Sequence, residues 1–453
     1  MNTTTPTDYE HALTVAAALA TAFLDGVKQR PAAVSPAPLA DFPEGIGTDA
    51  ALAWLRDHVE PGLSGSTGPR YFGFVTGGAT PAAIAGDWLA SAYNQNVSHD
   101  VGSIAAALER ATAARFGELF GLDRSLQGHF VSGATAANLV ALATARQALH
   151  RRAGLDTATA GLHAAPAVRI VGGAPHSSIA KAASILGLGR ASVNAVACLP
   201  GRTAVDPAAL EAFLADSRSP MIVIASAGEV NTGDFDDLTA LADLCERYGA
   251  WLHVDGAFGL FAAFSRDHRA RLAGIARADS VTVDLHKWLN VPYDGAIAYT
   301  RHPDPQRDVF RASAAYLGDT PDPLHFVPEN SRRFRALPAW MALVAYGSEG
   351  IAEAIERSCE QARSLADGIA GIEGLDLLDP VRLNIVCFAP ATTGAEARDR
   401  LLAWLVADGR IFLTPTVLHG RPALRLAVSN WRTTENDVEI TLQALRDAIA
   451  AVA

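Results

Sequence analysis

Short apolar runs alternate with longer amphipathic stretches between about residues 128 and 287. The apolar runs predict β-strands, and the amphipathic stretches between them predict helices. The expected strands are Phe130–Val131, Val168–Val171, Ser192–Ala197, Met221–Ala225, Trp251–Val254 and Ser280–Val283. The expected helices are 134–151, 178–186, 207–215 and 237–248. This alternation, with apolar strands, predicts an α/β fold around a mostly parallel central sheet.

The flanking regions have different patterns. Helices are expected at 9–28, 49–59 and 81–94, and strands at 384–388 and 424–428 follow further helical stretches after Pro338. We therefore expect three parts, listed here with their bounds: an N-terminal helical segment (1–65), a large α/β domain (66–335) and a smaller α+β C-terminal domain (336–453).

Composition narrows the class of protein. The chain has 453 residues, of which 49% are hydrophobic and 19% charged, as in a globular protein with a large buried core. A net charge of -11 argues against nucleic acid as a partner. No apolar stretch approaches the roughly 18 residues of a membrane span, so no membrane association is expected.

The cysteines and the N-terminus bear on location. The four cysteines are scattered without metal-ligand spacing, so we expect no metal site and a reducing, cytoplasmic environment. The apolar run 13–24 lacks a preceding basic region, which favours an amphipathic helix over a signal peptide.

The candidate chemistry lies at the ends of two predicted strands. Asp255 ends the apolar run that begins at Trp251, and Lys287 follows the run that ends at Val283. Ligands of such sheets bind beyond the carboxyl ends of the strands. A lysine and an aspartate there suit pyridoxal 5'-phosphate (PLP), which needs an amine for its Schiff base and a carboxylate for its pyridine nitrogen.

A small-residue turn follows the first strand of this region. Ser132, Gly133, Ala134 and Thr135 lead directly into a helix, whose N-terminal N–H groups could hold a phosphate together with the two hydroxyls. The same pattern also describes an ordinary helix with Ser or Thr as its N-cap.

His176 follows the predicted strand 168–171. Its imidazole could stack on a pyridine ring and contact a substrate carboxylate. A histidine at a helix start is also often a capping or surface residue, and both interpretations remain open.

Together these residues resemble the group II PLP-dependent amino-acid decarboxylases, of PLP fold type I, which include aromatic-L-amino-acid, histidine and glutamate decarboxylases. The resemblance extends from about residue 71 to residue 430. It depends on five motifs, at Ser132–Asn138, His176–Ala182, His253–Ala257, Asp284–Trp288 and Ser331–Leu337 with Trp340.

The resemblance implies a role for each matched residue. Lys287 would form the Schiff base, Asp255 would pair with the pyridine nitrogen, and His176 and Ala257 would pack on opposite ring faces. The remaining expected cofactor contacts are Ser132, Gly133, Ala134, Thr135, Asn231 and His286.

The resemblance also implies a reaction and an assembly. An L-amino acid would lose CO2 through an external aldimine and a quinonoid intermediate, and Tyr316, in a Tyr-Leu pair, would return a proton to Cα as a general acid. An ordinary loop tyrosine is the alternative. Enzymes of this fold type are homodimers with the active site at the subunit interface, and we expect the same here.

Several positions depart from the family pattern. Glu229 lies in a run, 228–231, where many relatives have Gly-Thr-Thr or Gly-Thr-Val. It could contact the substrate or form a structural pair elsewhere. Arg425 could clamp a carboxylate or be structural, and contacts of His99 or Asp100 with substrate are equally undecided.

Other reactions remain possible on the same cofactor. They are transamination, aldehyde-forming oxidative decarboxylation and carbon–carbon bond cleavage. A non-catalytic PLP-binding protein is a weaker alternative, because the candidate catalytic residues Lys287, Asp255, His176 and Tyr316 are all present. A metal site built on His253 and Asp255 is also weaker, since no third metal ligand is evident.

Overall fold

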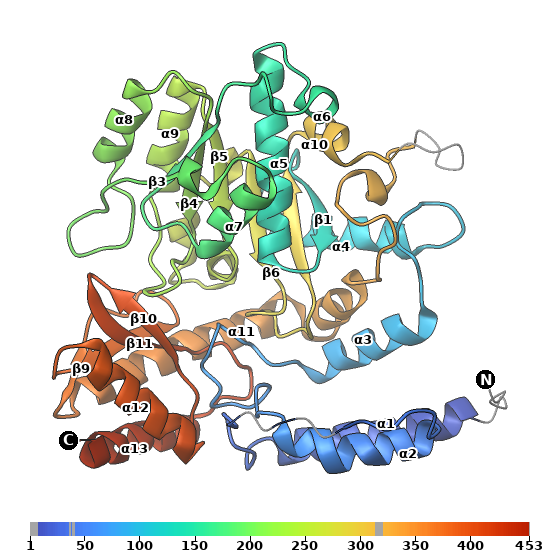
Figure 1. Ribbon diagram of the computed structural model, residues 1–453, viewed down its shortest axis with the longest axis vertical. Helices are drawn as coiled ribbons and strands as arrows, with labels where there is room; N and C mark the ends of the chain where they lie inside the picture. Colours follow the sequence, from blue (N-terminus) through green and yellow to red (C-terminus); the bar gives the residue numbers. More distant parts are fainter. Residues whose placement is uncertain (1–7, 36–37, 39–40, 313–319, 453) are drawn as a thin grey trace.

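The protein is described by a computed structural model that covers residues 8–35, 38, 41–312 and 320–452. A seven-stranded sheet lies at its centre, with strand order β1-β7-β6-β5-β4-β2-β3 (Figure 1). The strands are β1 (Gln127–Val131), β2 (Arg169–Gly172), β3 (Val193–Ala195), β4 (Met221–Ser226), β5 (Trp251–Asp255), β6 (Ser280–Asp284) and β7 (Ala296–Thr300). Strands β3, β2, β4, β5 and β6 run parallel, whereas β7 pairs antiparallel with both β6 and β1. The predicted α/β fold with a mostly parallel sheet is confirmed.

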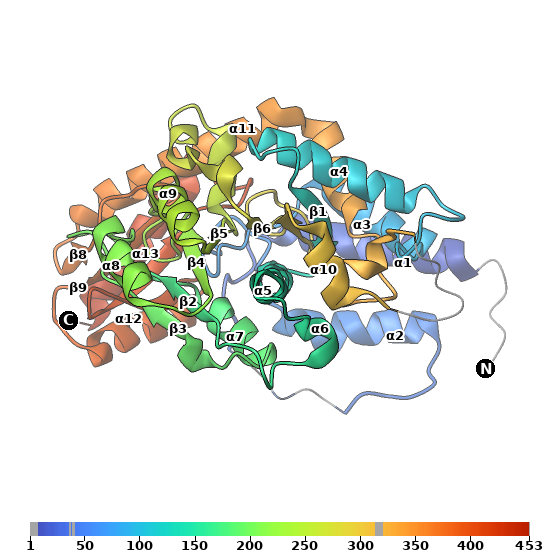
Figure 2. The ribbon, with the colours of Figure 1, turned by 90° about the horizontal axis from the view of Figure 1, so that it is seen from above.

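Helices cover both faces of this sheet, so its central strands are buried along their whole length. Every residue of β5, β6 and β7 is buried. Helix α5 (Ala134–Arg152) lies across one face with α7 (Ser177–Ile185), and α4 (Ala105–Leu119) and α9 (Leu238–Tyr248) lie on the other (Figure 2). The remaining helices of this region are α6 (Thr157–Ala160), α8 (Pro207–Asp216) and α10 (Pro303–Phe310).

A second, antiparallel sheet forms the C-terminal region, in the order β10-β11-β9-β8. Its strands are β8 (Leu375–Leu377), β9 (Ile385–Pro390), β10 (Thr414–Leu418) and β11 (Arg421–Ala427), and it is accompanied by α12 (Ala395–Asp408) and α13 (Glu435–Val452). The long helix α11 (Ala336–Ala370) connects the two sheets and is interrupted at Gly347, whose φ is 64°. This arrangement agrees with an α+β C-terminal region, and the division at residues 65 and 335 stays a prediction.

The N-terminal helices lie along one side of the molecule (Figure 1). They are α1 (Asp8–Gly26), α2 (Thr48–Trp54) and α3 (Pro81–Tyr93). Helix α3 packs on α11, whereas α1 and α2 extend away from the central sheet.

One buried ion pair ties the segment before α11 to the start of the sheet. The Arg332 guanidinium lies 2.7 Å from the Glu109 carboxylate of α4, and both side chains are almost fully buried. Arg332 also donates hydrogen bonds to the carbonyl oxygens of Val97 and Phe130. The contact at Phe130 places this arginine directly behind the turn that follows β1.

The described residues contain no helix suited to span a membrane and no group of side chains suited to hold a metal ion. None of the helices there is long and apolar enough to cross a membrane. No cluster of three or more His, Cys, Asp or Glu side chains in that part of the chain is arranged to hold a metal ion.

Candidate active site

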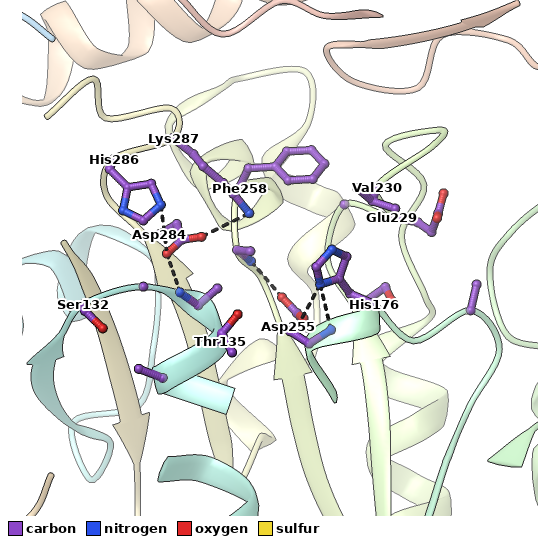
Figure 3. Close-up of a pocket in the computed structure, with 18 residues that line it drawn as sticks. Ser132, Thr135, His176, Glu229, Val230, Asp255, Phe258, Asp284, His286 and Lys287 are labelled. Atoms are coloured by element: carbon purple, nitrogen blue, oxygen red, sulfur yellow. Dashed lines mark hydrogen bonds and ion pairs between the residues drawn. The ribbon is translucent and has the colours of Figure 1, made fainter. Parts of the chain in front are cut away.

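A cavity of about 250 Å³ opens at the carboxyl ends of β4, β5 and β6 (Figure 3). It is the place where the strand-end lysine and aspartate were expected, and both line it. The lining comprises Ser132, Gly133, Ala134, Thr135, Ala136, Ala174, His176, Ser178, Ser226, Gly228, Glu229, Val230, Asp255, Ala257, Phe258, Asp284, His286 and Lys287. The structure therefore brings together every described candidate cofactor residue except Asn231.

Lys287 lies three residues beyond the end of β6. Its Nζ is 3.1 Å from Oδ2 of Asp284, the last residue of that strand, and 6.0 Å from the ring centre of Phe258. The other oxygen of Asp284 accepts a 2.5 Å hydrogen bond from the backbone N–H of Ala134. Asp284 thus connects the lysine with the N-terminus of α5 (Figure 3).

The turn before α5 is not the ordinary capped helix that its sequence also allowed. The N-cap residue is Gly133, which has no side chain to cap the helix, and the first N–H group of α5, that of Ala134, is bonded to the Asp284 carboxylate instead of to a Ser or Thr of the turn. The hydroxyl-bearing residues Ser132 and Thr135 instead line the cavity. Because backbone N–H groups at a helix N-terminus attract anions, this end of the cavity is suited to a phosphate group.

Asp255 ends β5 on the opposite side of the cavity and is buried. One carboxylate oxygen accepts a 3.2 Å hydrogen bond from the N–H of Ala257, and the other accepts a 3.1 Å hydrogen bond from the side-chain amide of Asn138. The two donors hold the carboxylate in one orientation at the strand end.

His176 is the capping residue that its sequence context allowed, and its ring also lines the cavity, whereas its stacking on a cofactor ring stays a prediction. It is the N-cap of α7, where Nδ1 accepts a hydrogen bond from the N–H of Ser178. Desolvation lowers the pKa of His176 below its ordinary value, and the positive charges of Lys287 and Arg425 act in the same direction, against Asp255 and Asp284. The imidazole is therefore neutral near pH 7.

His286 lies beside the lysine. The N–H of Gly295 donates to its Nδ1 at 3.3 Å, and its Nε2 lies 3.6 Å from Oδ1 of Asp284. Its ring packs on Tyr293 with 4.4 Å between centres. Burial lowers the pKa of His286, so the ring is neutral, and because Nδ1 accepts from Gly295 its proton is on Nε2, on the side of the Asp284 carboxylate.

Glu229 does not direct its carboxylate at the lysine. Its two oxygens accept hydrogen bonds from the backbone and side chains of Asn231 and Thr232, and Figure 3 shows the group turned away from Lys287. Burial raises the pKa of Glu229, while these hydrogen bonds and the Arg425 charge act in the opposite direction. The carboxylate holds the turn formed by residues 229–232, which agrees with the interpretation that Glu229 forms structural contacts rather than substrate contacts.

The structure does not bring Asn231 to the cavity. Its side chain donates to Glu229 and accepts a 2.7 Å hydrogen bond from Thr416 of β10. Arg425 also lies behind the loop, where it is buried and donates to the carbonyl of Val230. The loop turns outward after Val230, so the next residue faces the C-terminal sheet.

Two other sequence candidates lie elsewhere, and a third is not described. His99 pairs with Asp322, and Asp100 pairs with Arg110, so neither residue lines the cavity. Tyr316, the candidate acid, falls outside the described residues.

Three residues that contribute to the site were given no role in the prediction from sequence. Asp284 and Asn138 belong to motifs that were recognised, but neither had been given a role. Phe258 adds an aromatic wall beside the lysine. A polar residue next to a matched motif position was the available signal for the first two.

Comparison with known proteins agrees with this site. Residues 44–390 match the pyridoxal-dependent decarboxylase conserved domain. Since the match covers well over half of the chain, the protein belongs to the pyridoxal-dependent decarboxylase family, whose cofactor is PLP.

Relatives and solved structures place the chain within that family. It is 30% identical over 421 residues to an aromatic-L-amino-acid decarboxylase of Bacillus atrophaeus, covering 88% of this chain and 85% of the relative. It is 32% identical over 380 residues to an L-2,4-diaminobutyrate decarboxylase of Rhizobium meliloti, covering 80% and 74%. The Oryza sativa TDC structure with PLP and tryptamine superposes with a TM-score of 0.91 at 25% identity, covering 100% of this chain and 99% of that one.

The residues present fit this cofactor. One cavity holds an amine (Lys287), a carboxylate (Asp255) and a helix N-terminus with two hydroxyl residues. These are the three groups that the aldehyde, the pyridine nitrogen and the phosphate of PLP require.

Proposed function

We propose that this cavity is the active site of an L-amino-acid decarboxylase in which Lys287 holds the cofactor and Asp255 pairs with its ring nitrogen. The observation that carries the proposal is the shared cavity of these two side chains at the ends of adjacent strands. When bound, PLP supplies the electron sink for the electron pair that the departing carboxylate leaves on Cα.

The other side chains would position the reactants. The N-terminus of α5, with Ser132, Thr135 and His286, would hold the phosphate, and Ala257 would pack against one ring face. His176 would cover the opposite face and, as a neutral imidazole, would orient the substrate carboxylate without binding it as a fixed ion. Phe258 would help to exclude water beside the lysine.

The substrate is proposed to be an L-amino acid with an uncharged side chain. The inward-facing acids, Asp255 and Asp284, are already engaged with Asn138 and with Lys287 and Ala134, and Glu229 is turned into its own loop. No further carboxylate lines the cavity to receive a side-chain ammonium group, within the described residues. This favours an aromatic or aliphatic substrate over a diamino acid.

Proton return to Cα is assigned to Tyr316, a residue outside the described part of the chain. Replacing it with Phe should lower the yield of amine and raise that of aldehyde or ketone. An unchanged amine yield would exclude Tyr316 as the acid.

We further propose a homodimer and a reducing, cytoplasmic location. Large hydrophobic side chains are exposed on α3, namely Trp88, Leu89 and Tyr93, which supports a second copy covering this helix. The four cysteines are free thiols, as expected in a reducing compartment. Sedimentation of the PLP-loaded protein should give twice the chain mass of 47.4 kDa, and a monomer would contradict the proposal.

The first experiment locates the cofactor. The chain has three lysines, Lys28, Lys181 and Lys287, so reduction with borohydride followed by peptide mass mapping gives an unambiguous position. PLP should be attached at Lys287. The Lys287→Ala variant should lose this label and its activity, whereas Lys181→Ala, at an exposed position on α7, should retain both.

The second experiment identifies the reaction. The loaded enzyme is incubated with each common L-amino acid and with L-2,4-diaminobutyrate, and amine, aldehyde and keto-acid products are measured by mass spectrometry. Amine and CO2 from an aromatic or aliphatic substrate support the proposal. Turnover of the diamino acid alone would overturn the substrate class, and keto acid or aldehyde would overturn the reaction.

A further inference from the structure

Asn138, on the first turns of α5, lies at the centre of a buried hydrogen-bond chain beneath the cavity. Its side chain is fully buried, and its amide reaches two residues of the site. Nδ2 lies 3.1 Å from the Asp255 carboxylate and 3.0 Å from the Ser178 hydroxyl. On its other side, Oδ1 lies 2.9 Å from Nε2 of His253.

The Asp255 carboxylate determines which atom donates and which accepts in the hydrogen bonds of Asn138. A carboxylate only accepts hydrogen bonds, so the Asn138 group that faces it must be the NH2. The two hydrogens of that NH2 match its two acceptors, Asp255 and the Ser178 oxygen. The amide oxygen must then face His253 and receive a proton from Nε2.

The far end of this hydrogen-bond chain is compatible with the same direction. Burial lowers the pKa of His253 to about 4, so its ring is neutral and has one N–H. With that proton on Nε2, Nδ1 accepts from the Ser280 hydroxyl at 2.9 Å. The Ser280 oxygen in turn accepts from the indole N–H of Trp251 at 2.9 Å, a group that can only donate.

At its cavity end, the hydrogen-bond chain reaches His176 through Ser178. Since the Ser178 oxygen accepts from Asn138, its own hydrogen is available to His176 Nδ1, 2.8 Å away. The backbone N–H of Ser178 points at the same nitrogen from 3.3 Å. Two donors that converge on Nδ1 require a lone pair there, which puts the proton of the neutral ring on Nε2.

We propose that Asn138 is a positioning residue which, through Ser178, holds His176 as the Nε2–H tautomer and at the same time orients the Asp255 carboxylate. His176 then enters the cavity as a hydrogen-bond donor, the form that attracts a substrate carboxylate; the opposite tautomer would present a lone pair and repel it. The functional part of this inference rests on the proposed function, but the tautomer itself does not.

The tautomer is measured on the cofactor-free chain. Two-bond ¹H–¹⁵N correlation spectra of protein labelled in its histidine rings distinguish the two neutral tautomers from the imidazolium, and His176→Gln assigns the signals by their loss. Near pH 7 the wild-type signals of His176 should have the Nε2–H pattern. An Nδ1–H pattern or an imidazolium would overturn the proposal.

The decisive variant is Asn138→Asp, which keeps the shape and replaces the NH2 donor with an acceptor. The Ser178 hydroxyl should then turn toward the new carboxylate, and the His176 spectrum should lose its single-tautomer pattern. Asn384→Asp is the matched control, because Asn384 is equally buried but lies in the C-terminal region, bonded to the carbonyl of Val428. An unaltered His176 spectrum in folded Asn138→Asp would refute the inference.

A second variant covers the case in which Asn138→Asp does not fold. Ser178→Ala removes only the hydroxyl between Asn138 and His176, so the Nδ1 resonance of His176 should move toward the position of a nitrogen without a hydrogen bond. A stationary resonance would also refute the inference.

Activity gives a separate readout. With the substrate found above, Asn138→Asp should lower kcat on the order of 10–100-fold, the usual effect of losing an orienting partner. Asn384→Asp should leave kcat unchanged. If the wild type has the Nε2–H tautomer but no decarboxylase activity, the proposed function fails while the tautomer assignment stands.

Discussion

Acid should destabilise this protein in part through His129, and the His129→Phe substitution should remove that contribution. His129 lies in β1, buried and stacked on Phe326 with 4.7 Å between ring centres and 8° between planes. Its Nε2 has no hydrogen-bond partner. A phenylalanine of similar shape should therefore keep the stacking on Phe326 without the loss of a hydrogen bond.

The magnitude follows from the pKa. Burial, together with the charge of Arg332 nearby, lowers the pKa of His129 from 6.5 to about 3 in the folded chain. The unfolded chain therefore binds the proton first, and stability falls as the pH drops below about 6.5 and continues to fall until about pH 3. Between about pH 7.5 and pH 5 this single site should cost about 2 kcal/mol.

Thermal unfolding of the wild type and of His129→Phe at the two pH values measures this cost. At about 2.1 cal/mol/K per residue, the chain has an unfolding entropy near 1 kcal/mol/K, so the variant's acid-induced fall in Tm should be about 2 °C smaller. His163→Phe, at an exposed position, is the matched control and should behave as the wild type does. An equal fall in Tm for His129→Phe and the wild type would refute the reasoning.

Three further substitutions test the supports of the site. Arg332→Met leaves a buried glutamate of α4 without its partner and should cost about 3–5 kcal/mol in urea unfolding; a loss below about 1 kcal/mol would contradict this. Glu229→Ala removes the acceptor that closes its loop and should raise the Kd for PLP several-fold, with Glu229→Gln milder; equal Kd values for Glu229→Ala and the wild type would exclude the bracing role. In Gly77→Ala the added Cβ would lie 1.8 Å from the carbonyl oxygen of Lys287, so bound cofactor absorbance should be lost, whereas Gly26→Ala, with nothing within 4 Å, should keep it. Full cofactor retention in Gly77→Ala would contradict this prediction, because it would mean that the backbone carbonyl of Lys287 can move aside without loss of cofactor.

The sequence was most informative where local pattern and chemistry coincide. The apolar runs before Asp255 and Lys287 predicted buried strands, and in the structure Asp255 ends one such strand and Lys287 follows another. The same reasoning did not identify β7, because a short run such as Ala296–Thr300 has no polar alternation to separate it from a buried helix segment. Its antiparallel pairing with β1 depends on contacts distant in sequence.

The side chains that were missed depend on tertiary contacts. Asn138 faces Asp255 only because α5 crosses β5 at that turn, and nothing in its local sequence specifies this. Asn231 was expected at the cofactor, but its neighbour Glu229 accepts its side-chain amide and draws it toward β10. The residue at one position of a loop can thus redirect the side chain two positions further on, an effect that motif matching does not detect.

The bond between Asp284 and the N–H of Ala134 joins residues 150 positions apart in the chain. At about 5–20 residues per second, a ribosome needs roughly 8–30 s to synthesise the intervening segment. The turn that begins α5 therefore leaves the ribosome well before the strand that completes the site. A nascent chain that ends before Asp284 should be unable to retain the cofactor, so cofactor capture would report that β6 has been synthesised and has joined the sheet.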